Sequence, residues 1–415
     1  MPMTTAKSSL IDSGDNQVMK IDQIKLRGLG ETPECGWLEL DPTLTRIHFQ
    51  NSASRNGFLR AIETINPPYG CAIAQPFADY PTVIKRNDYT KVISPGKRTI
   101  MMCILEAAPG LVHQLAEISP LFYETDRIEI GRRLDYSRWL NFIELPSSSR
   151  WSEVSTEISS LLNNSMPPEE RAKIHPCIGN LKPSDRIKGS VQESLRLWLK
   201  QLMNETPEKQ RLFRSLLSKV NRADHFRKAR TLVRDHLPLF VKIDTLDTGP
   251  HQPCSALRYL FDIFTRNIAE VPTHSRHKAQ VFIEQVNSEL RKLPFLQPEI
   301  HFCPAQNFAK LIIVHEGQAC KDLRMLSTLL QLQITAALAS VLSRVIYNSD
   351  PLLIFSGVDQ PRLPEEAHLL VHQINRIAAH CQCIYGTDDN SIFREEFTGI
   401  LYQEKYFIED RVCAR

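Results

Sequence analysis

The arrangement of apolar and polar positions is clearest in the last hundred residues of the chain. A continuous apolar run at 351–355 predicts a buried strand, and the apolar positions between Ala367 and Ala379 repeat with the period of a helix. A second apolar run at 381–385 predicts another buried strand. Because continuous apolar strands joined by a helix are typical of parallel sheets, this stretch predicts a βαβ unit.

The rest of the chain alternates between strand-like and helix-like patterns. The Asn-Pro-Pro sequence at 66–68 ends the first predicted helix. The segment from about 151 to 293 is mostly helical without sustained heptads, which predicts a compact insertion and not a long coiled coil. The other expected strands are two within 20–40 and those at 44–49, 99–105, 128–130, 139–145, 237–244 and 308–316, and the other expected helices are at 58–65, 112–118 and 332–347.

Four motifs, in a fixed order, resemble those of the ABC-type ATPases of the SMC, RecF and OLD-like group. The strand, loop and helix at 44–65 stand where that family has its phosphate loop, and 326–331 stands at its signature motif. The strand at 351–355 precedes the Walker B position, and the strand at 381–385 precedes the switch position. The resemblance implies an α/β fold, with an ABC-ATPase-like mixed sheet, flanking helices and a compact helical insertion.

The residues that carry the family's chemistry are mostly replaced. Arg55 stands in place of the phosphate-loop lysine, and Asn56 in place of the hydroxyl that binds Mg²⁺. Ser356 and Gly357 replace the Walker B acids, and Asp388 replaces the switch histidine. Each lost group supplies charge or a metal ligand in phosphoryl transfer, so we expect no enzymatic activity, no cofactor and no metal site. The degenerate nucleotide-pocket positions are Asn51, Ser54, Arg55, Asn56, Ser327, Gln331, Ser356, Gly357 and Asp388.

Three functions are open at this point. The resemblance implies a catalytically inactive ATPase-like scaffold or sensor in a multiprotein complex of DNA repair or anti-phage defence. Its partner would be a nuclease, another effector or an intact ATPase acting in trans. The second function is nucleic-acid binding. The third is an atypical active ATPase, in which Arg55 binds phosphate and Asp359 or Asp388 replaces the missing carboxylates. Taken alone, the segment 44–65 also fits an ordinary strand–turn–helix.

One stretch inside the insertion concentrates positive charge. Residues 188–236 contain twelve Lys and Arg against five Asp and Glu, whereas the whole chain carries only +3. A solvated helical face is the ordinary explanation. DNA or RNA is the rival explanation, because the charge is concentrated and not interleaved. The candidate nucleic-acid-binding residues are Arg211, Arg214, Lys219, Arg222, Arg227, Lys228, Arg230 and Arg234.

Leu329 and Leu330 put apolar side chains where the family's signature motif is polar. If they are exposed, they predict an interface with another subunit in a dimer or hetero-oligomer. If they turn inward, they belong to the core face of the helix at 332–347, which Ser327 would cap. Both interpretations are consistent with the pattern.

The composition limits the class of protein, its location and its metal sites. Hydrophobic residues make up 42% and charged residues 23% of the chain, as in soluble globular proteins. The chain contains no run of about 18 apolar residues, so we expect no membrane span. The polar N-terminus predicts a cytoplasmic location. The ten cysteines are scattered without a CxxC pair, which favours reduced thiols over a metal site. We expect a polar extension at 1–18, an N-terminal ATPase-like lobe at 19–150, the helical insertion at 151–300 and a C-terminal ATPase-like lobe at 301–415.

Overall fold

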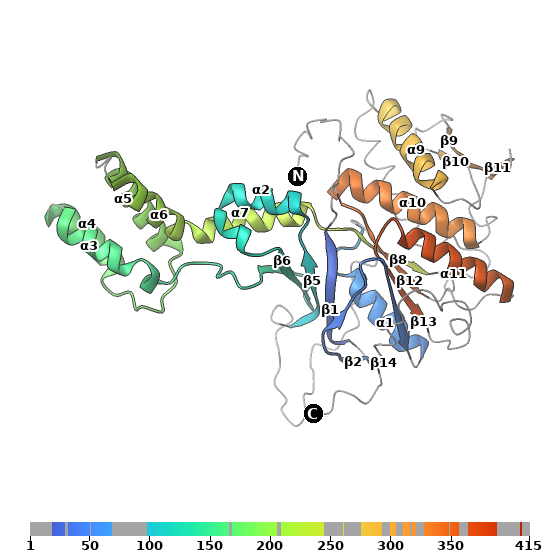
Figure 1. Cartoon of the computed structure of the whole chain (residues 1–415), viewed down its shortest axis with the longest axis horizontal. Helices are drawn as coiled ribbons and strands as arrows, with labels where there is room; N and C mark the ends of the chain where they lie inside the picture. Colours follow the sequence, from blue (N-terminus) through green and yellow to red (C-terminus); the bar gives the residue numbers. More distant parts are fainter. Residues whose placement is uncertain are drawn as a thin grey trace.

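The protein consists of a head, built around two larger sheets, and an arm of helices that extends from one side of it (Figure 1). The arm comprises residues 151–221. Within the described ranges, no helix combines the length and the apolar character that a bilayer crossing requires. The computed structural model describes residues 19–29, 32–49, 51–68, 98–165, 168–205, 209–244, 260, 275–292, 299–303, 310–315, 318–320, 328–347, 349–356, 364–387 and 407–408.

An antiparallel sheet forms one side of the head. Its order is β2-β1-β5-β6-β7, and β3 also pairs with β1. Alternate side chains, such as Ile24, Leu26 and Leu105, are buried in the core beneath it. The elements of this lobe are β1 (Lys20–Leu29), β2 (Thr32–Glu34), β3 (Leu38–Glu39), β5 (Thr99–Glu106), α2 (Pro109–Ile118), η3 (Pro120–Glu124), β6 (Arg127–Arg133) and β7 (Arg138–Phe142).

A parallel sheet of five strands forms the centre of the head, in the order β14-β4-β13-β12-β8. Every pair in it is parallel. Both faces are covered, because Ile354 and Ile384 lie in one core while Leu353 and Phe355 lie in the other. This explains the continuous apolar runs in the sequence. The strands are β4 (Leu44–Phe49), β8 (Phe240–Asp244), β12 (Leu352–Ser356), β13 (Cys383–Thr387) and β14 (Phe407–Ile408).

Helices fill both faces of the parallel sheet. Helix α1 lies between the two sheets and buries Phe58, Leu59 and Ile62 completely. Helix α10 covers the other face between α9 and α11, and every side chain at 332–343 in it is buried, as expected for a helix enclosed on all sides. A small antiparallel sheet, β11-β10-β9, lies beside α9. These elements are α1 (Ser52–Glu63), α9 (Ser275–Arg291), β9 (Glu299–Cys303), β10 (Lys310–His315), β11 (Gln318–Cys320), α10 (Thr328–Tyr347) and α11 (Pro364–Ala378).

The arm has a hydrophobic core of its own, which includes Trp151, Trp198 and Phe213. Helix α7 connects the arm to the head, because its buried residues Phe226 and Val233 belong to the head core and its side packs against α2. Figure 1 shows α7 alongside α2, with the arm helices beyond it. The elements are η4 (Trp151–Glu153), α3 (Ser155–Ser165), α4 (Pro168–Ile178), α5 (Gly189–Glu205), α6 (Gln210–Val220) and α7 (Arg222–Asp235).

The expected α/β fold with flanking helices and a compact helical insertion is confirmed, and the parallel and antiparallel strands of the expected mixed sheet lie in separate sheets. The helical arm is shorter than the expected range 151–300, since β8 and α9 within that range belong to the head. The polar extension at 1–18 lies outside the described residues. The C-terminal strand β14 was not expected, because two residues are too few to produce a recognisable pattern.

Candidate functional site

The parallel sheet places Ser356, one of the expected nucleotide-pocket positions, at its carboxyl edge. Its strands all end there, and Ser356 lies opposite Gly386 of β13 on one side and opposite Asp244 of β8 on the other. Gly386 in turn lies opposite Ile47 of β4. Ligands of open α/β sheets bind outside the carboxyl ends of the strands, so this edge is the candidate site.

The connection between β4 and α1 differs most from a phosphate loop. β4 ends at Phe49 and α1 begins at Ser52, so only two residues separate them. The expectation of a loop across 50–57 is therefore wrong from Ser52 onward. The physical reason is the Asn51 side chain, whose Oδ1 accepts a hydrogen bond from the Ser54 N–H at 2.8 Å and caps the helix early. A phosphate loop surrounds its anion with backbone N–H groups, and so short a connection has few to offer.

Asn56 and Ser356 meet at the centre of the site. Ser356 Oγ donates a hydrogen bond to Asn56 Oδ1 at 2.9 Å, although 300 positions separate the two residues. The positions aligned with the metal-binding hydroxyl and with the Walker B aspartate thus lie side by side. Both side chains are neutral, and each is the other's partner. Mg²⁺ is usually bound through carboxylates and substrate phosphates, and this pair supplies no carboxylate.

Arg55 does not present its charge at the surface. Its side chain is only 3% exposed, whereas an arginine that grips a phosphate must be reachable by the ligand. Phe49, aligned with the first glycine of a phosphate loop, is fully buried, and its ring centroid lies 5.5 Å from that of Phe58. The start of α1 itself is open to solvent, since Asn51, Ser52 and Ala53 are exposed, whereas Phe49 and Arg55 on either side of it are buried.

Gly386 is required by close packing of β13 against α1. A Cβ atom at this position would come within 2.6 Å of Leu59 Cδ1 and 3.1 Å of the Phe49 ring. Only glycine lets the strand approach the helix so closely. The glycine thus allows close packing of β13 against α1 in the core.

The signature side of the site is described only in part. Helix α10 begins at Thr328, and Gln331 in its first turn is half-buried. Leu330 is 2% exposed and packs in the core, with Leu329 partly buried against the same core. Of the two interpretations left open for these leucines, the structure supports the inward one for Leu330, because the helix turns it into the core. Ser327, Gly357, Asp359 and Asp388 lie outside the described residues.

The arrangement offers little for metal chemistry. Among the residues that the structure describes, no group of three or more His, Cys, Asp and Glu gathers closely enough to hold a metal ion. His372, which follows His368 by four positions on α11, is exposed. At the described edge of the sheet, Asn56 and Ser356 form a neutral hydrogen-bonded pair, Arg55 is buried, and Asp244 ends the neighbouring strand β8.

A second candidate surface lies along α6 and α7. Six of the eight expected basic side chains are exposed there, and the side chain of Arg227 is 78% exposed. Arg230 lies over the Phe226 ring at 5.5 Å, and partial burial lowers the pKa of its guanidinium. The exposed six are Arg211, Arg214, Arg227, Lys228, Arg230 and Arg234.

The other two basic residues hold the arm together. Lys219 Nζ donates hydrogen bonds to the Glu153 carbonyl at 3.1 Å and to Glu157 at 3.3 Å. Arg222 donates to the Glu153 carboxylate at 2.8 Å. Because acids near the base of the arm already neutralise these charges, Lys219 and Arg222 are structural residues and not nucleic-acid contacts.

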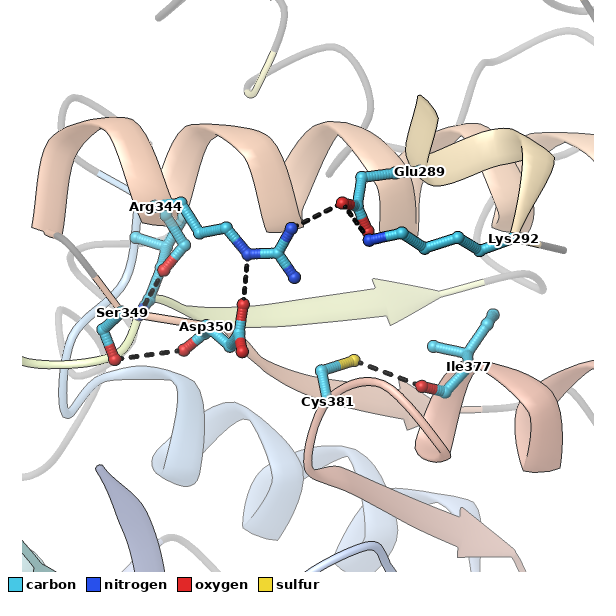
Figure 2. Close-up of polar contacts among 9 residues, drawn as sticks. Glu289, Lys292, Arg344, Ser349, Asp350, Ile377 and Cys381 are labelled. Carbon is cyan, nitrogen blue, oxygen red and sulfur yellow. Dashed lines mark hydrogen bonds and ion pairs between the residues drawn. The ribbon is translucent and has the colours of Figure 1, made fainter. Parts of the chain in front are cut away.

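The sequence interpretation missed a polar cluster around Arg344 (Figure 2). Arg344 lies on α10 and donates to Glu289 of α9 and to Asp350, which precedes β12, at 2.5 Å each. Burial alone would raise the pKa of Glu289, but hydrogen bonds and charge from Lys292 and Arg344 lower it overall. A single arginine within a long apolar helix was the signal that could have revealed this cluster.

Comparisons with known proteins give structural matches only. No protein-family model matches the chain, and no curated protein matches it. The Smc head domain of Pyrococcus furiosus bound to the C-terminal domain of ScpA is 12% identical with a TM-score of 0.38, and the match covers 90% of this chain and 91% of that chain. The SMC head domain from Thermotoga maritima is 11% identical with a TM-score of 0.35, covering 90% of each chain.

The recombination mediator RecF in its ATP-analogue form is 10% identical with a TM-score of 0.36, covering 90% of this chain and 94% of that chain. At these identities and TM-scores, the matches are similarities only and assign neither a family nor a function. The fold assignment itself rests on the strand order and on the meeting of Asn56 with Ser356. The chain is therefore an α/β protein with a five-stranded parallel sheet, a separate antiparallel sheet and a helical arm.

Proposed function

We propose that this chain is a non-hydrolysing scaffold or sensor subunit that keeps an ATPase-like fold for protein assembly. The observation that carries the proposal is the early start of α1 at Ser52, which leaves only two chain positions after β4 in place of the longer glycine-rich loop that surrounds a phosphate. The Asn56–Ser356 hydrogen bond and the burial of Arg55 support it, because they occupy the places of metal and phosphate contacts. The atypical ATPase is disfavoured by the same contacts.

Nucleotide titration tests the proposal directly. Purified protein is titrated with ATP and Mg²⁺ by calorimetry, and phosphate release is followed in parallel. We expect no saturable heat and no turnover. Turnover near about 1 per second, abolished by Arg55→Ala, would overturn the proposal. A matched variant, Arg60→Ala, removes an exposed arginine from the same helix and should leave both measurements unchanged.

The scaffold role implies a partner that acts in trans in DNA repair or anti-phage defence. The tagged full-length chain is purified from its native host and its companions are identified by mass spectrometry. A nuclease or an intact ATPase in comparable molar amount supports the scaffold. Nucleic acid recovered without protein favours the second function.

That second function is nucleic-acid binding by the exposed basic side chains of α6 and α7. The observation that favours it is their exposure at the junction of arm and head, where Arg211 and Arg214 lie on α6 and Lys228 and Arg234 lie on α7. Concentrated positive charge attracts the phosphate backbone independently of sequence. A scaffold that also contacts DNA or RNA is compatible with the same fold.

A further inference from the structure

A cleft of about 960 Å³ lies at the edge of the parallel sheet opposite the candidate site. It is lined by the start of β1, by the segments between β5 and β6, and by the residues that lead into β12 and β13. The cleft shares no lining residue with the carboxyl ends of the strands. It therefore requires an explanation separate from nucleotide chemistry.

Its charged lining is mainly acidic. Glu106, Glu124, Asp126 and Asp350 line the cleft, together with Lys20. Asp350 is already paired with Arg344. The first three carboxylates are exposed, and within the described part of the chain they make no side-chain hydrogen bond or ion pair. Three unneutralised carboxylates from neighbouring segments favour a positively charged occupant.

The same cleft carries an exposed aromatic ring and apolar surface. Tyr123 is 59% exposed, and its hydroxyl lies 3.2 Å from His113 Nδ1, with the two rings packed edge to face at 5.8 Å. This contact holds the tyrosine ring in place. Val112, Pro109 and Ala379 add apolar lining. Long cationic side chains suit such a lining, because their stems bury on apolar surface while their charge meets carboxylates or a ring face.

We propose that this cleft binds a basic peptide segment of a partner protein. An arginine or lysine of the segment lies against Tyr123, with its charge near Glu106, Glu124 and Asp126. A metal ion is a poorer occupant, because these acids do not gather as a metal-binding group among the described residues. The volume is in the range of sites that enclose several side-chain groups, and is larger than a single ion needs.

Fluorescence anisotropy tests the proposal with the full chain and a short labelled peptide of alternating arginine and serine, in low salt. The matched probe is the same peptide with glutamine in place of arginine. We expect the arginine peptide to bind at least about tenfold more tightly than the glutamine peptide, since charge pairs in such sites are worth that difference.

Two double variants decide where the peptide binds. Glu106→Gln with Asp126→Asn should weaken the arginine peptide about tenfold. The control, Glu117→Gln with Glu144→Gln, removes the same charge from exposed positions outside the cleft and should change affinity less than about twofold. Tyr123→Leu should weaken binding about threefold through loss of the ring face.

The proposal is overturned if the two double variants lose the same affinity for the arginine peptide. It is also overturned if the wild-type protein binds the arginine and glutamine peptides equally, or binds neither of them. All substituted side chains are exposed, so the variants should have the same melting temperature as the wild type. The outcome is independent of nucleotide binding, because no residue of the candidate site is changed.

Discussion

Gln382 and Ile21, which lie 361 positions apart, are joined by two hydrogen bonds. The Ile21 N–H donates to Gln382 Oε1 at 2.9 Å, and Gln382 Nε2 donates to the Ile21 carbonyl at 2.8 Å. The same Nε2 also donates to the Asp41 carbonyl at 3.0 Å. Since Ile21 belongs to the antiparallel sheet and Gln382 leads into the parallel sheet, one side-chain amide connects the two layers of the head.

Gln382→Ala should therefore destabilise the head by about 2–4 kcal/mol, because it leaves buried backbone groups without partners. Urea unfolding followed by circular dichroism measures the change. Gln280→Ala is the matched control, since Gln280 is exposed on α9 and its side chain donates a hydrogen bond to Glu284 of the same helix. The control should stay within about 0.5 kcal/mol of wild type. A similar loss in both variants would contradict the role given to Gln382.

The Asn56–Ser356 hydrogen bond should contribute to folding and not to catalysis. Ser356→Ala and Asn56→Ala should each destabilise the protein by about 1–2 kcal/mol, with a coupling of about 0.5–1.5 kcal/mol in the double-mutant cycle. Denaturant unfolding of the four proteins gives the coupling. A coupling near zero would mean that the two side chains do not bind each other in solution.

Arg344→Gln should destabilise the protein by about 1–3 kcal/mol at neutral pH, since it removes the cation beside Asp350 and leaves Glu289 with Lys292 alone. Arg234→Gln is the control, because Arg234 and Asp235 are more than half exposed and 3.7 Å apart. It should change stability by less than about 0.5 kcal/mol. Equal effects would show that the cluster in Figure 2 is no stronger than a surface pair.

The same cluster predicts a dependence on pH. The folded protein lowers the pKa of Glu289 below its ordinary value of 4.5, so the unfolded chain binds this proton more readily. The stabilisation is present above that value and is lost as the pH falls through the lowered folded pKa. In Arg344→Gln this part of the acid decline should be smaller. Thermal melting between neutral and acidic pH checks it, and curves of identical shape would argue against it.

Replacing Arg211 and Arg214 with glutamine should weaken duplex DNA binding. The slope of affinity against salt should fall by roughly one unit for each phosphate that the variant no longer binds, because fewer counterions are released. Arg60→Gln with Lys182→Gln removes two exposed charges outside the basic stretch and should have no such effect. Fluorescence anisotropy over a series of salt concentrations measures both. If wild type binds no DNA or RNA in low salt, the basic stretch is a solvated face.

The C-terminal half of the head was the most predictable part. The apolar run before Ser356 and the helix at 367–379 became β12 and α11 within a few residues, since strands buried on both faces leave a strong pattern. The aligned motifs gave Asn56 and Ser356 separate positions, and the hydrogen bond between them was not predicted.

Other features depend on contacts that no local pattern contains. The early start of α1 results from the Asn51 cap, which competes with the loop that the family resemblance implied. Leu330 points inward because of how α10 is oriented about its axis against the surrounding hydrophobic core. The roles of Lys219 and Arg222 depend on Glu153 and Glu157, which lie more than sixty positions away.

The order of the strands in the parallel sheet has a consequence for how the protein folds. β4 near the beginning of the chain pairs with β13, whose residues are more than three hundred positions later. The hydrophobic core of the arm, by contrast, joins residues that lie at most about seventy positions apart. Closing so large a loop is entropically costly and slow. During synthesis the arm can therefore form while β4 waits for its neighbours, and the apolar face of α1 must be kept from other chains until the last strands leave the ribosome.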